Sequence, residues 1–337
     1  MKTRRHKQHG FSLIEVMIAM TIGLGISMLV VKIFTSSSAT YRIADSIGAL
    51  QETGRVALEN IDRDVQMAGF RGCNSNNVNN SGPLVNVITT PTGYLNDLGT
   101  SLQGYDAVGA AWSPALPGII AAAVPAPAVG SDVLVVRLPV GTPANLGAPM
   151  VSATGDIPLF SVTGFAVNDN AFIADCAQTA AFRISGIGGT SLRHAVGVNT
   201  NAGLSRAFAE DAMVVRFETR AYYVAPSSRN PATETSLWML AGAAAPVEVV
   251  EDVAGLQIQY GEDTDGDYVA NVFRKANAVA NFNSVVALQV SLLLRAPHAI
   301  EAQTITNYVY NGVTVVPADR YTRRVYTATI QLRNRTL

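Results

Sequence analysis

The stretch Gly10-Phe-Ser-Leu-Ile-Glu-Val-Met-Ile-Ala-Met20, with the apolar run that continues to Val31, decides how this chain is organised. Met1–His9 before it carries four basic side chains and no acidic one, and Val16–Val31 contains neither a charge nor a proline. As a helix, residues 11–31 would be about 30 Å long, enough to cross the hydrocarbon core of a bilayer. The basic flank predicts a cytoplasmic amino end, with the rest of the chain exported.

Glu15 is the one residue that does not fit an ordinary membrane helix. A charged side chain in this position costs about 2.5–3.5 kcal/mol on insertion scales, and no basic side chain follows within the next helical turns. Cleavage between Gly10 and Phe11 would create an α-amino cation beside the apolar segment and so provide a partner. A short basic leader, Gly10, Phe11 and then Glu15 as fifth residue of the cleaved chain resemble the type IV pilin signal. The resemblance implies N-methylation of Phe11 after cleavage.

Two other interpretations share part of this pattern. A secretory signal peptide would also have a basic start and an apolar centre, with small residues such as Ser37 and Ala39 at the cleavage site. A permanent signal anchor would look the same without cleavage. Neither accounts for a carboxylate at Glu15 next to Gly10-Phe11, so we favour the pilin-type interpretation.

Composition limits the classes of function. The 337 residues suffice for a sizeable core and one or two domains beyond the membrane segment. Removal of residues 1–10 leaves 20 basic and 25 acidic side chains, a formal charge of about −5 for the exported part. This balance argues against a nucleic-acid partner, because nucleic-acid surfaces need clustered basic charge.

Cys73 and Cys176 are the two cysteines, and both lie on the exported side. In an oxidising compartment an even pair predicts one disulfide. The closed loop would contain about a hundred residues, for which chain entropy predicts a stabilisation of about 4–5 kcal/mol. The alternative is a pair of buried free thiols.

A second helical pattern follows the apolar segment. Apolar residues recur at intervals of three and four, with polar residues such as Asp64 between them, and the pattern stops near Gly69 or Gly72. We expect one long helix whose first half is apolar all round and whose second half carries one apolar stripe. Gly23, Gly25 and Gly54 are positions where it could bend. The apolar stripe comprises Ile43, Ile47, Leu50, Val56 or Ala57, Leu58, Ile61, Val65 and Ala68.

The end of this helix also resembles a known family. Arg63-Asp64, Ala68-Gly69-Phe70 and Gly72-Cys73 match the segment that closes the long helix in the PilW family of minor pilins. The same residues are also explained as a helix stop that leads into a turn. The resemblance resumes near the C-terminus and does not extend through the middle of the chain.

The remainder is predicted to be mostly β-structure. Residues 74–160 are turn- and loop-rich, with one good strand at 132–138, and form a long loop-rich insertion. In Met213–Val224 apolar and charged residues alternate, and 284–295 with 321–333 form a long antiparallel pair. We expect an α+β, pilin-like fold, in which one long N-terminal helix packs on a C-terminal head rich in antiparallel β-sheet.

The sequence contains little that points to catalysis. His194 and His298 are the histidines left after the leader, and neither has a metal-ligand spacing. No nucleophile elbow, phosphate loop or zinc motif is present, so we do not expect an enzyme.

Asp263, Asp265 and Asp267 alternate around a glycine and could bind Ca²⁺ through carboxylate oxygens. The alternative is an acidic hairpin turn, because Asp-Gly is strong turn chemistry.

These observations give four expected segments: a basic leader (1–10), an apolar half-helix (11–33), an amphipathic half-helix (34–70) and a β-rich head (71–337). The resemblance implies a minor pilin that helps initiate or cap a type IV pilus. Its partners would be a prepilin peptidase and methylase, other minor and major pilins, the inner-membrane assembly machinery and membrane lipid. The head would be periplasmic first and then part of the pilus at the cell surface. A minor pseudopilin of type II secretion and a tip-displayed adhesin are the alternatives.

Overall fold

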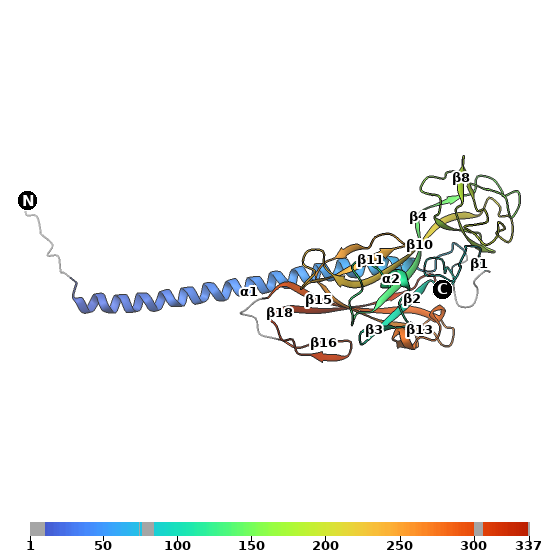
Figure 1. The fold of residues 1–337 in the computed structure, drawn as a ribbon. Helices are drawn as coiled ribbons and strands as arrows, with labels where there is room; N and C mark the ends of the chain where they lie inside the picture. The colour runs from blue at the N-terminus through green and yellow to red at the C-terminus, as the bar shows by residue number, and fades with distance from the viewer. Residues whose placement is uncertain (1–10, 74, 76–83, 300–305, 336–337) are drawn as a thin grey trace, which may run out of the picture.

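A computed structural model of the chain describes residues 11–73, 75, 84–299 and 306–335. A single helix, α1 (Leu13–Met67), carries the described chain from its amino end into a β-rich head (Figure 1). The helix contains 55 residues and is therefore about 80 Å long. The expected α+β architecture, with one long N-terminal helix and an antiparallel sheet-rich head, is confirmed.

The helix ends where glycines change the backbone direction. Ala68 caps the last turn, and both Gly69 and Gly72 have positive φ, at +74° and +66°. Side chains with a Cβ rarely adopt this conformation, whereas glycine does so at little cost. The backbone N–H of Gly69 donates to the carbonyl of Arg137 at 3.3 Å, so the end of the helix is attached directly to a strand.

A nine-stranded sheet is built around β10 (Met213–Pro226). On one side β10 pairs antiparallel with β4 (Val133–Asn145), and on the other with β6 (Asn170–Ala174) and then with β11 (Thr235–Ala241). The pair β1–β7 is parallel. The other strands of this sheet are β1 (Leu84–Asn86), β2 (Leu102–Val108), β3 (Ala111–Ser113), β7 (Thr179–Arg183) and β12 (Val247–Val250).

A four-stranded antiparallel sheet lies on another side of the helix. Its order is β14 (Val272–Arg274), β13 (Val253–Glu262), β15 (Val285–Ala299) and β18 (Tyr321–Gln331). The long β15–β18 pair confirms the predicted pairing of the last two strands. Short elements complete the described head: β5 (Ile157–Pro158), β8 (Gly186–Gly188), β9 (Ser191–Arg193), β16 (Tyr308–Tyr310), β17 (Val313–Val315), α2 (Gly118–Ala121), η1 (Ala276–Ala278) and η2 (Phe282–Ser284).

The largest core lies where both sheets meet the second half of α1. From Leu50 onward the predicted apolar stripe is buried except for Leu58, which is partly buried, whereas Ile43 and Ile47 are only partly covered. Residues from α1, from both sheets and from the turn after Met67 share this core, among them Leu50, Ala57, Ile61, Val65, Leu134, Tyr222, Ile258, Leu288 and Leu292. The head therefore folds around the last part of the helix and leaves the first part outside (Figure 1).

The segment 101–145 contributes more to the sheet than its sequence suggested. β4 extends beyond the predicted strand at 132–138, and β2 pairs with it along Leu102–Tyr105. Leu102, Tyr105 and the first residues of β4 are buried. Alanine and glycine around this segment obscured the strand signal, because small residues add little apolar contrast to an alternating pattern.

Candidate assembly helix and its attachment to the head

The first half of α1 is exposed along its whole surface. Leu13, Leu24 and Phe34 are 80%, 71% and 70% exposed, and the large apolar side chains between them are exposed as well. Within the described residues, α1 is the helix that is long and apolar enough to cross a membrane, by length and composition. An apolar surface of this extent requires lipid or other helices around it.

The helix begins with a reciprocal cap between Ser12 and Glu15. The Ser12 hydroxyl accepts a hydrogen bond from the Glu15 backbone N–H at 3.3 Å, and the Glu15 carboxylate accepts one from the Ser12 N–H at 3.0 Å. The Ser12 hydroxyl donates to the same carboxylate oxygen at 3.1 Å. This is a capping box, and the Ser-x-x-Glu signature in the sequence is the signal that could have predicted it.

The capping box gives Glu15 a partner that the sequence analysis did not consider. The carboxylate does not lack a partner within its own chain, because Ser12 supplies two donors. Phe11 precedes the helix and is exposed, and Gly10 lies outside the described residues. Cleavage between them, methylation of Phe11 and pairing of Glu15 with a neighbour's amine remain predictions.

A buried ion pair holds the second half of the helix to β10. The carboxylate of Asp64, only 2% exposed, accepts hydrogen bonds from Arg220 Nη1 at 2.8 and 3.1 Å and from the Tyr222 hydroxyl at 2.6 Å. Burial, reinforced by the negative charge of Asp64, raises the pKa of Tyr222, so the phenol stays protonated and donates. The sequence pattern placed Asp64 among the polar residues between the apolar positions, whereas the structure buries it as the polar contact of the interface.

Gly54 is a contact point and not a place where the helix bends. A Cβ at this position would lie 2.9 Å from Cδ2 of Tyr326 and 3.1 Å from Cδ1 of Leu294. The missing side chain lets the four-stranded sheet approach the helix backbone. Gly23 and Gly25 have open space around them and lie within the unbroken helix, so the structure shows no break at any of the three glycines.

The disulfide between Cys73 and Cys176 is present in the structure. It joins the turn that follows α1 to the loop between β6 and β7, across a sequence separation of 103 residues. The neighbouring Asp175 forms an ion pair with Arg206. The bond therefore connects the end of the helix to the nine-stranded sheet through the β6–β7 loop.

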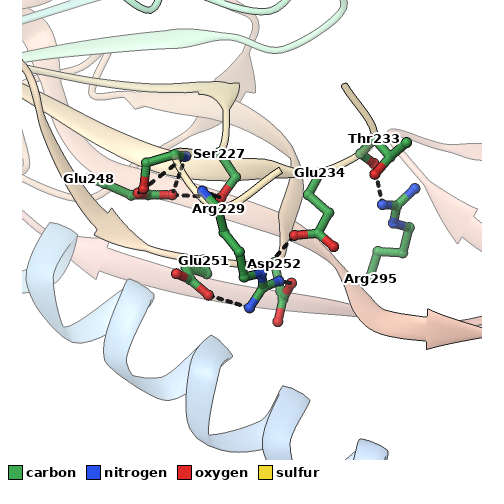
Figure 2. A network of polar contacts seen from close by, with 9 residues as sticks. Ser227, Arg229, Thr233, Glu234, Glu248, Glu251, Asp252 and Arg295 are labelled. Carbon is green, nitrogen blue, oxygen red and sulfur yellow. Dashed lines mark hydrogen bonds and ion pairs between the residues drawn. The ribbon is translucent and has the colours of Figure 1, made fainter. Parts of the chain in front are cut away.

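A network of ion pairs lies near α1 and joins two turns of the head (Figure 2). Arg229, in the turn after β10, contacts Glu234 at 2.7 Å, Asp252 at 2.9 Å and the carboxylate of Glu251 (Figure 2). These residues connect the β10–β11 turn to the β12–β13 turn. Exposed ion pairs add little individually, but one arginine shared by three acids fixes the relative position of two turns. The sequence pattern did not predict this network, because its members come from separate turns.

The three aspartates proposed for calcium do lie together. One carboxylate oxygen from each of Asp263, Asp265 and Asp267 falls within 4.8 Å of the others. Asp263 also accepts hydrogen bonds from the backbone N–H groups of Asp265, Gly266 and Tyr268, which is turn chemistry. Burial opposes ionisation of Asp263, but these donors outweigh it and lower its pKa. The hydrogen bonds explain the loop without an ion, and calcium binding stays a prediction.

The two histidines occupy unlike positions. His194 is buried, and its Nε2 lies 2.8 Å from the carbonyl oxygen of Gly155, while its ring meets that of Phe182 edge-on. His298 is exposed in β15. In the described part of the chain, the aspartate trio is the group of three or more His, Cys, Asp or Glu residues that meets the geometric requirement for a metal ion.

Two family models match this chain, one near its N-terminus and one in its C-terminal part. The family model for type IV pilus-assembly protein W matches residues 221–334, and the prokaryotic N-terminal methylation motif matches residues 5–30. A pilin-like protein of Thermus thermophilus, PilA3, is 36% identical over 72 residues. That alignment covers 21% of this chain and 31% of the relative. No solved structure matches significantly. The chain thus combines an amino terminus that matches the prepilin-type methylation motif, a long helix whose apolar first half is exposed, and a head whose residues 221–334 match the family model for type IV pilus-assembly protein W.

Proposed function

We propose that this protein is a minor pilin that takes part in type IV pilus assembly, in the complex that initiates or caps the filament. The observation that carries the proposal is the division of α1 into two halves. The half from Leu50 onward buries one face in the head, and the half before Phe34 is exposed and apolar. A helix of this kind can leave lipid for a bundle of similar helices with little change in its apolar burial.

The proposed sequence of events begins in the membrane. The peptidase cuts between Gly10 and Phe11 on the cytoplasmic face, and the new Phe11 amine is methylated. In the bundle the Glu15 carboxylate exchanges its contacts with Ser12 for the amine of a neighbouring subunit. This exchange offsets the cost of a charged side chain in an apolar setting and fixes the axial position of one subunit relative to the next.

The size of the head supports a special position in the filament. The described head contains a nine-stranded and a four-stranded sheet, with loops that extend well beyond the end of α1 (Figure 1). We infer that it contacts other minor pilins and lies on the periplasmic side before assembly. The PilW match at 221–334 covers the sheet that packs on the helix, which supports a shared mode of helix attachment.

Two measurements test this function. Mass spectrometry of the mature protein should find an N-methylated Phe11 at the amino end, whereas a start near Thr40 would establish a secretory signal peptide. A strain that lacks the protein should lose surface pili, and native-level expression should restore them. Normal piliation with defective protein secretion would identify a type II pseudopilin instead, and normal piliation with defective attachment would identify an adhesin.

A further inference from the structure

A polar cavity opens where the nine-stranded sheet divides. On one side of β10, β6 pairs as far as Arg216 and β11 begins to pair at Arg220, so neither strand continues along Phe217–Thr219. A cavity of about 320 Å³ lies at this gap. Its volume is within the usual range for small-molecule sites. The turn Ala241–Ala244 forms one wall, and its small side chains leave the opening free.

Arg183 lines the cavity and is held by neutral groups. It lies on β7 opposite Asn170, and its Nε donates to the Asn170 side-chain oxygen at 2.9 Å. Its Nη2 donates to the side-chain oxygen of Asn96 at 3.0 Å. Asn96 is 5% exposed and accepts a further hydrogen bond from Asn170 at 3.1 Å, so the amides fix the guanidinium in position. Among the described residues, Arg183 has no carboxylate partner, and its Nη1 takes part in no hydrogen bond.

Asp169 and Glu218 line the cavity, and one oxygen of each carboxylate already accepts hydrogen bonds from the protein. Asp169 Oδ2 accepts from Arg216 at 3.2 Å and from the Ala166 N–H at 2.8 Å. Glu218 Oε2 accepts from Arg220 at 2.9 Å. The second oxygen of each carboxylate has no donor within the described chain. Within the described residues, the cavity therefore offers one guanidinium without a carboxylate partner, together with two carboxylate oxygens that can accept from O–H or N–H donors.

We propose that this cavity binds a sugar acid, a small polyhydroxylated ligand with a single carboxylate. The ligand carboxylate pairs with Arg183 through Nη1, where a charge-assisted hydrogen bond has no competitor among the described residues. Hydroxyl groups of the same ligand donate to Asp169 Oδ1 and Glu218 Oε1. A neutral sugar leaves Arg183 unpaired, and a simple carboxylate leaves the two acceptors unused, so the combination of groups gives the selectivity.

The site is separate from the proposed assembly function, since Arg183 and the cavity wall contact neither the exposed half of α1 nor its amino end. The test uses the full-length processed protein in detergent micelles, titrated with D-glucuronate, D-glucose and acetate and followed by calorimetry. We expect saturable binding of glucuronate, with glucose and acetate each about tenfold or more weaker. Arg183→Gln should weaken glucuronate binding by about ten- to hundredfold, since one charge-assisted contact is lost.

Two further variants make the outcome decisive. Ala243→Trp fills the cavity from an exposed turn position without removing a polar group, and it should abolish binding. Arg193→Gln removes an exposed arginine that pairs with Asp156 away from the cavity, and it should bind as the wild type does. No saturable binding of glucuronate, equal binding of glucose, or unchanged affinity in both Arg183→Gln and Ala243→Trp would overturn the proposal. Loss of piliation plays no part in this readout.

Discussion

At the scale of single residues, Gly54 and Asp64 determine how closely the helix approaches the head. Gly54 provides the space in which the Tyr326 ring and the Leu294 methyl group contact the helix backbone. Asp64 provides the one buried charge on the helix, and Arg220 and Tyr222 neutralise and hydrogen-bond it. Gly54 has no side chain, which leaves room for the sheet, whereas Asp64 makes polar contacts across the interface. A substitution at Gly54 should therefore destabilise the protein by a steric clash, and one at Asp64 by the loss of hydrogen bonds.

Replacement of Gly54 by alanine should destabilise the head. The new Cβ would lie within about 3 Å of Tyr326 and Leu294, and overpacking of this kind typically costs about 1–3 kcal/mol. Gly48→Ala is the matched control, because Gly48 is in the same helix and a Cβ added there would have no atom within 4 Å. That control should be neutral or more stable by up to about 1 kcal/mol, through helix propensity alone. Equal melting temperatures for the two variants would contradict the contact described for Gly54.

Asp64→Ala should cost more than either glycine change. It leaves the Tyr222 hydroxyl without an acceptor and leaves Arg220 with Glu218 as its remaining partner, at 2.9 Å. Removal of one member of a buried pair costs about 3–5 kcal/mol, and the contact with Glu218 should keep the loss near the lower end. Denaturant unfolding measures it, with the exposed Asp45→Ala as control. A loss below about 1 kcal/mol would show that the pair does not hold the helix.

At the scale of elements, Asp132 connects the two sheets. It stands just before β4, and its carboxylate accepts from the Ala107 N–H of β2 at 2.9 Å and from the Ile258 N–H of β13 at 2.8 Å. Its own N–H donates to the carbonyl of Leu256 at 2.8 Å. A single side chain therefore satisfies backbone groups from both sheets at their junction.

The free energy of unfolding of the head should depend on pH because of Asp132. Burial, partly offset by the two N–H donors, raises the pKa of this carboxyl to about 6 from 3.8. The folded state therefore binds the proton more tightly than the unfolded state does. The contribution of Asp132 is greatest below about pH 4 and is lost as the pH rises to about 6, with a total change of about 3 kcal/mol.

The Asp132→Asn variant has no titrating group at position 132, so its comparison with the wild type separates the pH-dependent stability due to Asp132 from that due to other carboxyl groups. Asp319 and Glu248 have lowered pKa values, so they give the opposite trend in the whole protein. The difference in unfolding free energy between wild type and Asp132→Asn should grow in favour of the wild type as the pH falls from about 7 to about 4. A difference that is constant across this range would contradict the raised pKa.

The elements that the sequence predicted well are those with a strong local pattern. The apolar run, the stripe from Leu50 onward and the alternation in Met213–Val224 each repeat over many residues, and each appears in the structure as expected. The Asp64–Arg220 pair could not be predicted, because its partners are 156 residues apart and a charged residue between apolar positions is usually solvent-exposed. The role of Gly54 also depends on what packs against it, which no local pattern reports.

At the scale of the whole molecule, the chain is an elongated helix with two environments. The half of α1 before Phe34 has no contact with the described head, and the half from Leu50 onward forms the largest core with both sheets. The head can therefore fold completely while the exposed half exchanges lipid for other helices. In this account Glu15 distinguishes an anchor from an assembly element, because it is the acidic residue of the exposed apolar part and lies near its amino end, whereas the basic Lys32 lies near its other end.

The most direct test of this account is Glu15→Gln at native expression, in a strain that lacks the wild-type protein. Glutamine keeps the capping box with Ser12 but removes the negative charge, so the start of the helix is preserved. Ser12→Ala is the converse control: it removes the hydroxyl of the cap and retains the charge, and it should have the milder effect. Leader cleavage and membrane insertion should be normal in both variants.

The measurement is the number of surface pili, together with the amount of partner pilin that co-purifies with the protein. We expect Glu15→Gln to reduce both, since an amine left unpaired in an apolar bundle costs about 3–5 kcal/mol. Wild-type piliation and co-purification in Glu15→Gln would show that Glu15 serves only to cap its own helix, and would contradict the assembly role proposed for it.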